Sequence, residues 1–139
     1  MINFLFFSLV ALSKSNCEMM PEGLMISGAP FRSSNLGKLE KLESCEFWKE
    51  DSDILLMQVT GPKEGTNSLR DSTTLFILKQ DGSGNWQEAF HYIIEQRVYP
   101  SGERTTQPEV LKFPLELKKQ KDGRVFAILA TINEKVRIK

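Results

Sequence analysis

The sequence holds one histidine, His91, and two cysteines, Cys17 and Cys45, and these residues bound the chemistry open to the chain. A Ser-His-Asp or Cys-His arrangement would have to use His91, and a metal site with several histidine ligands is impossible. His91 stands among apolar and aromatic residues in the run 89–92. That setting favours a partly exposed histidine on the polar face of a strand over a catalytic base. We therefore expect no enzyme activity.

Carboxylates concentrate in residues 40–64, and Asp51 and Asp53 are one candidate pair among them. Paired carboxylates can perform acid-base chemistry or bind a hard cation such as Ca²⁺. The sequence turns apolar at Ile54, too early for a calcium-binding loop, so we expect a solvated turn. The glycine-rich run 81–84 is followed by no Gly-Lys-Ser/Thr and shows no dinucleotide-binding spacing. No cofactor and no metal ion is expected.

The two cysteines belong to no C-x-x-C pair, which disfavours zinc binding and thioredoxin-like chemistry. In an oxidising compartment the simplest expectation is a disulfide between Cys17 and Cys45. Such a bridge closes a loop of roughly 29 residues and contributes about 3 to 4 kcal/mol in the chain-entropy model. The alternative is two unpaired thiols.

Residues 1–13 carry no charged side chain and include the apolar run 4–12. This run is too short to span a bilayer, which needs about 20 helical residues. It fits the hydrophobic region of a secretory signal peptide, with Ala11 and Ser13 as the small residues before cleavage, although no Lys or Arg precedes it. We expect residues 1–13 to be a signal peptide and the protein to be secreted or periplasmic.

Two other interpretations of the N-terminus stay open. Residues 4–12 are also typical of a buried strand of the mature domain. Cys17 follows the apolar run at the place where a bacterial lipoprotein has its acylated cysteine, which would anchor the protein to a membrane. Lys14 and Asn16 depart from the residues that such a site favours.

Turn-forming residues divide the rest of the chain into short apolar segments, the pattern of an antiparallel β protein. Residues 14–38 are punctuated by Pro and Gly and are predicted to be irregular, with a short strand at 24–26. Residues 39–139 are predicted to form a single all-β domain, a meander of six to eight strands closed into a small barrel or folded into a sandwich. The expected strands are residues 41–49, 54–60, 73–79, 86–99, 109–118 and 124–137.

Two hairpins are expected from their turn residues. Asp122-Gly123 separates residues 115–117 from 125–128, and the run 81–84 separates 75–78 from the strand that begins at Trp86. Residues 86–97 also fit a helix, because Asn85 and Glu88 form a capping box and apolar side chains recur at helical spacing. A helix there would make the protein α+β. The aromatic and β-branched content favours the strand.

The connection from Tyr99 to Gln107 is the predicted recognition element. It joins two long strand candidates and carries Tyr99, Ser101, Glu103 and Arg104, the candidate binding residues. Loops on a β scaffold present recognition surfaces at a low ordering cost. The sequence therefore predicts an exported, non-enzymatic domain that binds a protein or another extracellular or envelope macromolecule, such as a secreted hydrolase that it inhibits.

The alternative function is a small β-barrel that binds an apolar small molecule. Its lumen would be lined by aromatic side chains, namely Trp86, Phe90, Tyr92 and Phe126. Nucleic acid is not an expected partner, because 18 basic residues balance 18 acidic ones. Residues 107–139 are mildly basic, which indicates either the solvated face of edge strands or a surface for an acidic partner or membrane headgroups.

Overall fold

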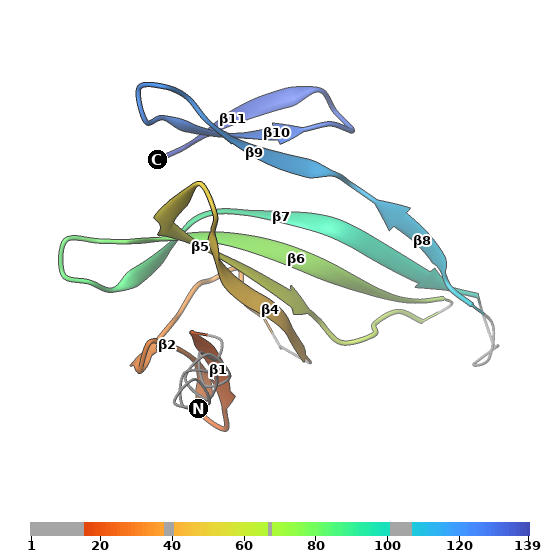
Figure 1. Cartoon of the computed structure of the whole chain (residues 1–139). Helices are drawn as coiled ribbons and strands as arrows, with labels where there is room; N and C mark the ends of the chain where they lie inside the picture. Colours follow the sequence, from red (N-terminus) through yellow and green to blue (C-terminus); the bar gives the residue numbers. More distant parts are fainter. Residues whose placement is uncertain (1–15, 38–40, 67, 101–106) are drawn as a thin grey trace, which may run out of the picture.

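The computed structural model describes residues 16–37, 41–66, 68–100 and 107–139, and these form eleven strands and no helix. The strands make three antiparallel sheets in which consecutive strands are neighbours (Figure 1). The predicted all-β meander is therefore confirmed. The expected signal peptide, residues 1–13, lies outside the described residues.

The five-stranded central sheet lies between the two smaller sheets (Figure 1). The N-terminal sheet contains β1 (Cys17–Met20), β2 (Gly23–Ile26) and β3 (Ala29–Pro30). The central sheet contains β4 (Lys41–Trp48), β5 (Asp51–Thr60), β6 (Leu69–Gln80), β7 (Trp86–Tyr99) and β8 (Glu109–Lys112). The C-terminal sheet contains β9 (Leu115–Lys119), β10 (Val125–Leu129) and β11 (Glu134–Ile138). β4 and β8 are the outer strands of the central sheet, so the layering is that of a sandwich.

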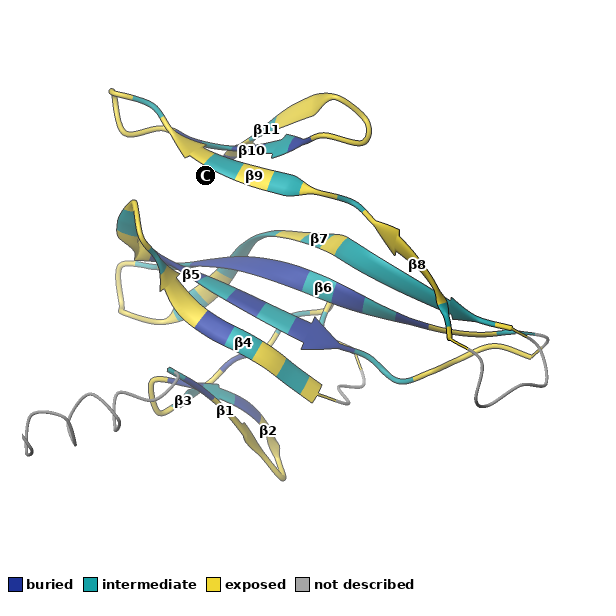
Figure 2. Cartoon of the chain, turned by 45° about the vertical axis from the view of Figure 1, so that its right-hand side comes forward, coloured by how far each residue is buried: buried dark blue, intermediate teal, exposed yellow. Residues whose placement is uncertain are grey.

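The central sheet contributes to two hydrophobic cores, one on each of its faces, because successive side chains of a strand point to opposite faces. On β5, Leu55 and Met57 face the N-terminal sheet, whereas Ile54 faces the C-terminal sheet. On β6, Phe76 likewise belongs to the first core and Ile77 to the second. The middle strands are consequently buried on both faces, as Figure 2 shows for β5 and β6.

The strand at residues 86–99 is confirmed, and the helix alternative is wrong. β7 pairs with β6 along its whole length, from Gln80 opposite Trp86 to Leu69 opposite Tyr99. Asn85 does not cap a helix, because its backbone N–H donates to the Asp81 carboxylate (3.0 Å) and its carbonyl accepts from Asp81 N–H (2.8 Å). These bonds close the predicted hairpin turn.

The described part of residues 39–139 forms eight strands, β4–β11, within the six to eight expected, but three segments of the chain differ in detail from the sequence prediction. The N-terminal segment expected to be irregular forms β1–β3, because Gly23 (φ 136°) and Gly28 (φ 82°) allow tight reversals. The strand expected at 109–118 is interrupted at Pro114, which has no N–H to pair. The strand expected at 124–137 is the hairpin β10–β11, with Asn133 at a φ of 52°.

The predicted disulfide is present. Cys17 on β1 is bonded to Cys45 on β4 with a Cα–Cα distance of 6.0 Å, and both residues are buried. The bridge joins the N-terminal sheet to the edge strand of the central sheet. A sulfur held in a disulfide cannot also carry a lipid, so the bridge and the lipid anchor at Cys17 exclude each other.

Candidate functional site

Two chain connections emerge together at one end of the central sheet, which we call the loop end. Leu69, the first residue of β6, lies opposite Tyr99, the last residue of β7. The connection between β5 and β6 and the connection between β7 and β8 therefore leave the sheet side by side, at the right of Figure 1. Of the predicted binding residues, Tyr99 lies at this end, whereas Ser101, Glu103 and Arg104 lie outside the described residues.

Tyr99 is fixed by contacts on two sides. Its hydroxyl donates to Asp71 Oδ2 (3.2 Å), and the ammonium group of Lys63 lies 4.2 Å from the centre of its ring. Lys63 belongs to the β5–β6 connection, so this cation–π contact joins the two connections directly. Tyr99 is thus a rigid starting point for the loop that follows it.

Arg97 is the centre of a polar network behind Tyr99. Its Nε donates to Asp71 Oδ1 (2.6 Å), Nη1 donates to Glu95, and Nη2 donates to Thr73 Oγ1 (3.1 Å). Burial alone would lower the pKa of Arg97, but the hydrogen bonds and charges of Asp71 and Glu95 outweigh it and raise the pKa. The guanidinium group stays charged and fixes the end of β7 against β6.

The network continues across the sheet to β4. Thr73 Oγ1 lies 3.0 Å from Thr60 Oγ1, and Thr60 donates to Glu43 Oε2 (2.7 Å). Thr60 and Thr73 are buried, so satisfied hydroxyl groups replace apolar contacts at this end of the sheet. No local sequence pattern predicts this network. The sequence shows only that Asp71 and Arg97 lie near the ends of two long strands. That they lie opposite each other depends on the pairing register of β6 and β7.

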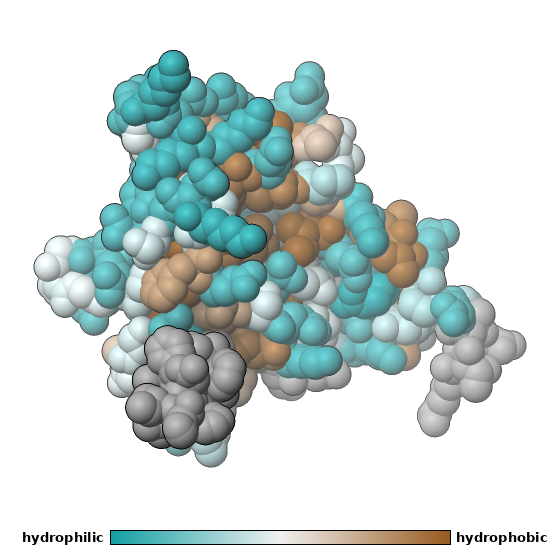
Figure 3. Space-filling model, viewed as in Figure 1, coloured by the Kyte–Doolittle hydropathy of each residue, from teal (hydrophilic) through white to brown (hydrophobic). Residues whose placement is uncertain are grey.

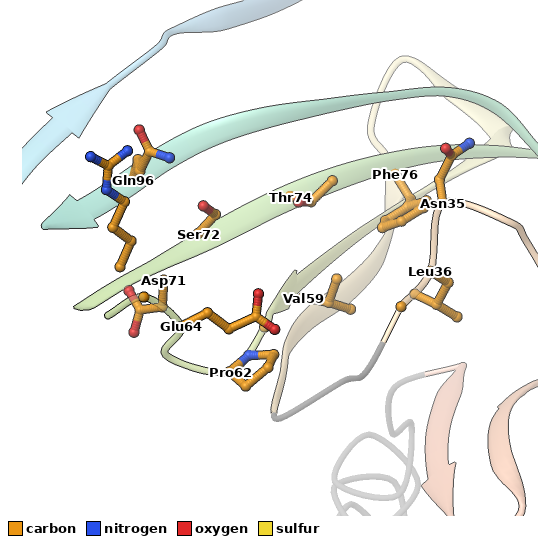
Figure 4. A pocket seen from close by; sticks show the side chains of 14 residues that line it. Asn35, Leu36, Val59, Pro62, Glu64, Asp71, Ser72, Thr74, Phe76 and Gln96 are labelled. Carbon is orange, nitrogen blue, oxygen red and sulfur yellow. The ribbon is translucent and has the colours of Figure 1, made fainter. Parts of the chain in front are cut away.

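A hollow of about 490 Å³ opens at the loop end on the face that carries the N-terminal sheet. Its apolar part includes Leu36, Val59 and Phe76, and its polar part includes Glu64, Thr74 and Gln96 (Figure 4). Such a mixture of a small apolar floor and a few polar groups is common in binding sites.

The β5–β6 connection folds back tightly at the edge of this hollow. Glu64 and Arg70 exchange two backbone hydrogen bonds, both 2.8 Å long. Gly65 has a φ of 133°, and a Cβ there would lie 2.1 Å from the Ser68 carbonyl oxygen. Only glycine permits this close approach, so the backbone holds Glu64 and Arg70 in place while their side chains remain exposed.

A second polar cluster involves the only histidine of the sequence. Glu88 accepts hydrogen bonds from Ser33 Oγ and from Asn35 Nδ2 (2.8 Å), and its Oε2 lies 2.8 Å from His91 Nδ1. Burial raises the pKa of Glu88, but the bonds from Ser33, His91 and Asn35 outweigh it and leave the pKa lowered. The carboxylate lies between the hydroxyl and the imidazole, so His91 does not take a proton from Ser33. The cluster instead fastens residues 33–35 to β7.

The carboxylates of the β4–β5 turn are also accounted for by the structure. Asp51 accepts a bond from Asp53 N–H (2.9 Å) and pairs with Lys119 Nζ (3.4 Å). The Asp53 N–H bond is the largest influence on the pKa of Asp51 and lowers it. Burial opposes this, but the charge and hydrogen bond of Lys119 add to the lowering, so the pKa stays below its ordinary value. In the part of the chain that the structure describes, no three His, Cys, Asp or Glu residues are placed to hold a metal ion. No helix long and apolar enough to cross a membrane occurs among those same residues.

The four aromatic residues expected to line a barrel lumen do not all lie in one interior. Trp86 packs against the core between the N-terminal and central sheets. Phe90 and Tyr92 pack against the core between the central and C-terminal sheets. Phe126 lies beneath the cations of Arg124 and Lys135. A separate groove of about 350 Å³ lies between β9 and the central sheet and is lined in part by Leu56 and Leu115.

Comparison with family models, with curated proteins and with solved structures finds no match for this chain. The geometry of the loop end and the chemistry of its side chains are accordingly what bears on function.

Proposed function

We propose that the protein is an exported, non-enzymatic domain that binds another macromolecule at its loop end. The observation that carries this proposal is the contact between Lys63 and Tyr99, which makes one surface from two connections far apart in the sequence. The fixed network of Arg97 and Asp71 beneath it supplies a rigid base. A surface ordered in advance loses little conformational entropy on binding.

Export is supported by the disulfide, because such bonds persist in oxidising compartments. With the apolar run 4–12, the bridge favours a secreted or periplasmic location for the mature chain. The predicted contacts of Ser101, Glu103 and Arg104 belong to the same proposal, because their loop starts at Tyr99. The alternative, a carrier of an apolar small molecule, is less well supported because Trp86, Phe126 and the pair Phe90 and Tyr92 lie on three different faces.

The proposal is tested with two matched double variants. Glu64→Ala with Arg70→Ala removes one acid and one base from the loop end, and Lys49→Ala with Glu50→Ala removes the same charges from the β4–β5 turn at the opposite end of β5. All four side chains are exposed, so both variants should fold. Each protein, with its disulfide intact, is immobilised and exposed to the extracellular or periplasmic fraction of the source cells.

We expect the wild type and the turn variant to retain the same partner and the loop-end variant to lose it. A separate Arg104→Ala variant tests the predicted loop contact. Equal retention by all variants would show that the loop end is not the binding surface.

A further inference from the structure

The two parts of the chain carry opposite charge. Residues 115–139, which form the C-terminal sheet and its turns, hold seven basic and three acidic side chains. The remaining residues hold eleven basic and fifteen acidic ones. The chain has no net charge, but its C-terminal sheet is basic and the rest of the chain, which we call the acidic body, is acidic. Figure 3 shows hydrophilic side chains gathered over the C-terminal sheet.

The register of the C-terminal sheet places three of these cations, Lys118, Lys135 and Arg137, on its outer face. Val125, Ala127 and Leu129 are buried against the central sheet, so Phe126 and Ile128 point outward. Phe126 lies opposite Lys118 on β9 and opposite Arg137 on β11. Ile128 lies opposite Lys135 on β11. A line of two apolar side chains along β10 is thus flanked by cations.

The cations of this face are only partly neutralised. The ammonium group of Lys135 lies 4.6 Å and the guanidinium carbon of Arg124 5.6 Å from the centre of the Phe126 ring. Arg124 also pairs with Asp122 (2.7 Å), and Glu116 lies opposite Ile128. Lys118, Lys135 and Arg137 are exposed and, among the described residues, pair with no carboxylate.

We propose that this outer face of the C-terminal sheet docks on an anionic lipid bilayer. Exposed Lys and Arg near such a surface each contribute about 1 kcal/mol through attraction to lipid phosphates. Phe126 and Ile128 then lie at the boundary between headgroups and acyl chains, where aromatic and apolar side chains are favoured. A hydrated polysaccharide or a nucleic-acid backbone offers no apolar region to cover this line, so a bilayer fits the face better.

The surface is distinct from the loop end, and its failure would leave the loop-end proposal intact. A domain held on a membrane by this face would present its acidic body away from the lipid. The lipid anchor considered at Cys17 is not needed, because docking uses side chains of the C-terminal sheet alone.

The test measures binding to sedimentable vesicles of phosphatidylglycerol and phosphatidylcholine in equal parts, with pure phosphatidylcholine vesicles as the lipid control. The face variant is Lys135→Gln with Arg137→Gln. The matched control is Arg32→Gln with Lys49→Gln, which removes two exposed cations from the acidic body. The disulfide-bonded full chain is used throughout, and circular dichroism confirms that each variant is folded.

We expect the wild type and the control variant to bind the anionic vesicles and not the zwitterionic ones. The face variant should bind roughly 30-fold more weakly, because two cations at about 1 kcal/mol each are lost. Equal binding of the two variants would overturn the proposal. Wild-type binding to soluble heparin or duplex DNA without binding to anionic vesicles would also overturn it.

Discussion

The two outer sheets cover opposite faces of the central sheet by different means. The N-terminal sheet has strands of four, four and two residues and adds few buried apolar side chains, chiefly Leu24 and Ile26. It is tied to the central sheet by the bridge between Cys17 and Cys45. A layer this small buries too little apolar surface to offset the entropy of ordering it, so a covalent link supplies the difference.

The C-terminal sheet has strands of five residues and no disulfide. It buries Val125, Ala127, Leu129 and Ile138 against the central sheet, with further half-buried side chains around them. It is also continuous with β8 through two residues, Phe113 and Pro114. Packing and short-range chain connection are sufficient here. The stability of this protein therefore depends on a bridge on one face of the central sheet and on packing on the other.

Loss of the bridge should have the largest effect. Replacing Cys17 and Cys45 by Ser should lower the free energy of unfolding by about 3 to 4 kcal/mol, measured by urea denaturation. Amide exchange should accelerate first in β1 and β2 and least in β10. Equal acceleration in β2 and β10 would show that the bridge does not act on the N-terminal sheet specifically.

Packing on the other face should be tested by shortening a buried side chain of β11. Ile138 is 4% exposed. Ile138→Ala should lower the free energy of unfolding by about 2 to 3 kcal/mol, because it leaves a cavity in the core between the central and C-terminal sheets. Thermal unfolding with and without reductant measures this cost. The loss should be similar in both conditions, since the bridge acts on the opposite face. A loss that vanished on reduction would contradict the division of roles.

The noncovalent fastening of the N-terminal segment should depend on pH through Glu88. The folded-state pKa of Glu88 lies below its ordinary value of 4.5, so its stabilising bonds are present above that pH and are lost as the pH falls through the folded pKa. Glu88→Gln should cost about 1 kcal/mol at neutral pH. The difference in unfolding free energy between wild type and variant should shrink on acidification below 4.5. A difference in unfolding free energy that stayed constant with pH would show that the ionised Glu88 carboxylate is not what stabilises the wild type.

The smallest effect is expected for the ion pair that joins β9 to the β4–β5 turn. Lys119 and Asp51 are partly exposed and lie 3.4 Å apart. Lys119→Gln should cost roughly 0.5 kcal/mol, since exposed ion pairs contribute little. A cost as large as that of Ile138→Ala would mean that the C-terminal sheet depends on this contact rather than on packing.

Local turn chemistry and cysteine count were sufficient to predict part of this structure. Asp122-Gly123 and the run 81–84 form the expected hairpins, because Gly123 (φ 90°) and Gly84 (φ 87°) adopt conformations that favour glycine. The pairing of Cys17 with Cys45 followed from there being two cysteines in the chain. The three-sheet layering could not be predicted from the sequence, because frequent Gly and Pro residues are as typical of a set of short strands as of an irregular segment.

The side-chain clusters could not be predicted, since they depend on which strands become neighbours. Ser33 reaches Glu88 across 55 positions of sequence, and Thr60 meets Thr73 only in the observed register of β5 and β6. The predicted role of Tyr99 as a binding residue stays a prediction. The structure adds its contacts with Lys63 and Asp71, which no local pattern contains.

We propose export of the mature protein, and the structure shows that a disulfide holds its N-terminal sheet. The most direct test is the intact mass of the protein from its native cell fraction, measured with and without reduction and alkylation. We expect a chain that begins at Lys14 and whose two thiols react only after reduction. A chain that retains Met1 and has two thiols reactive without reduction would contradict both export and the bridge.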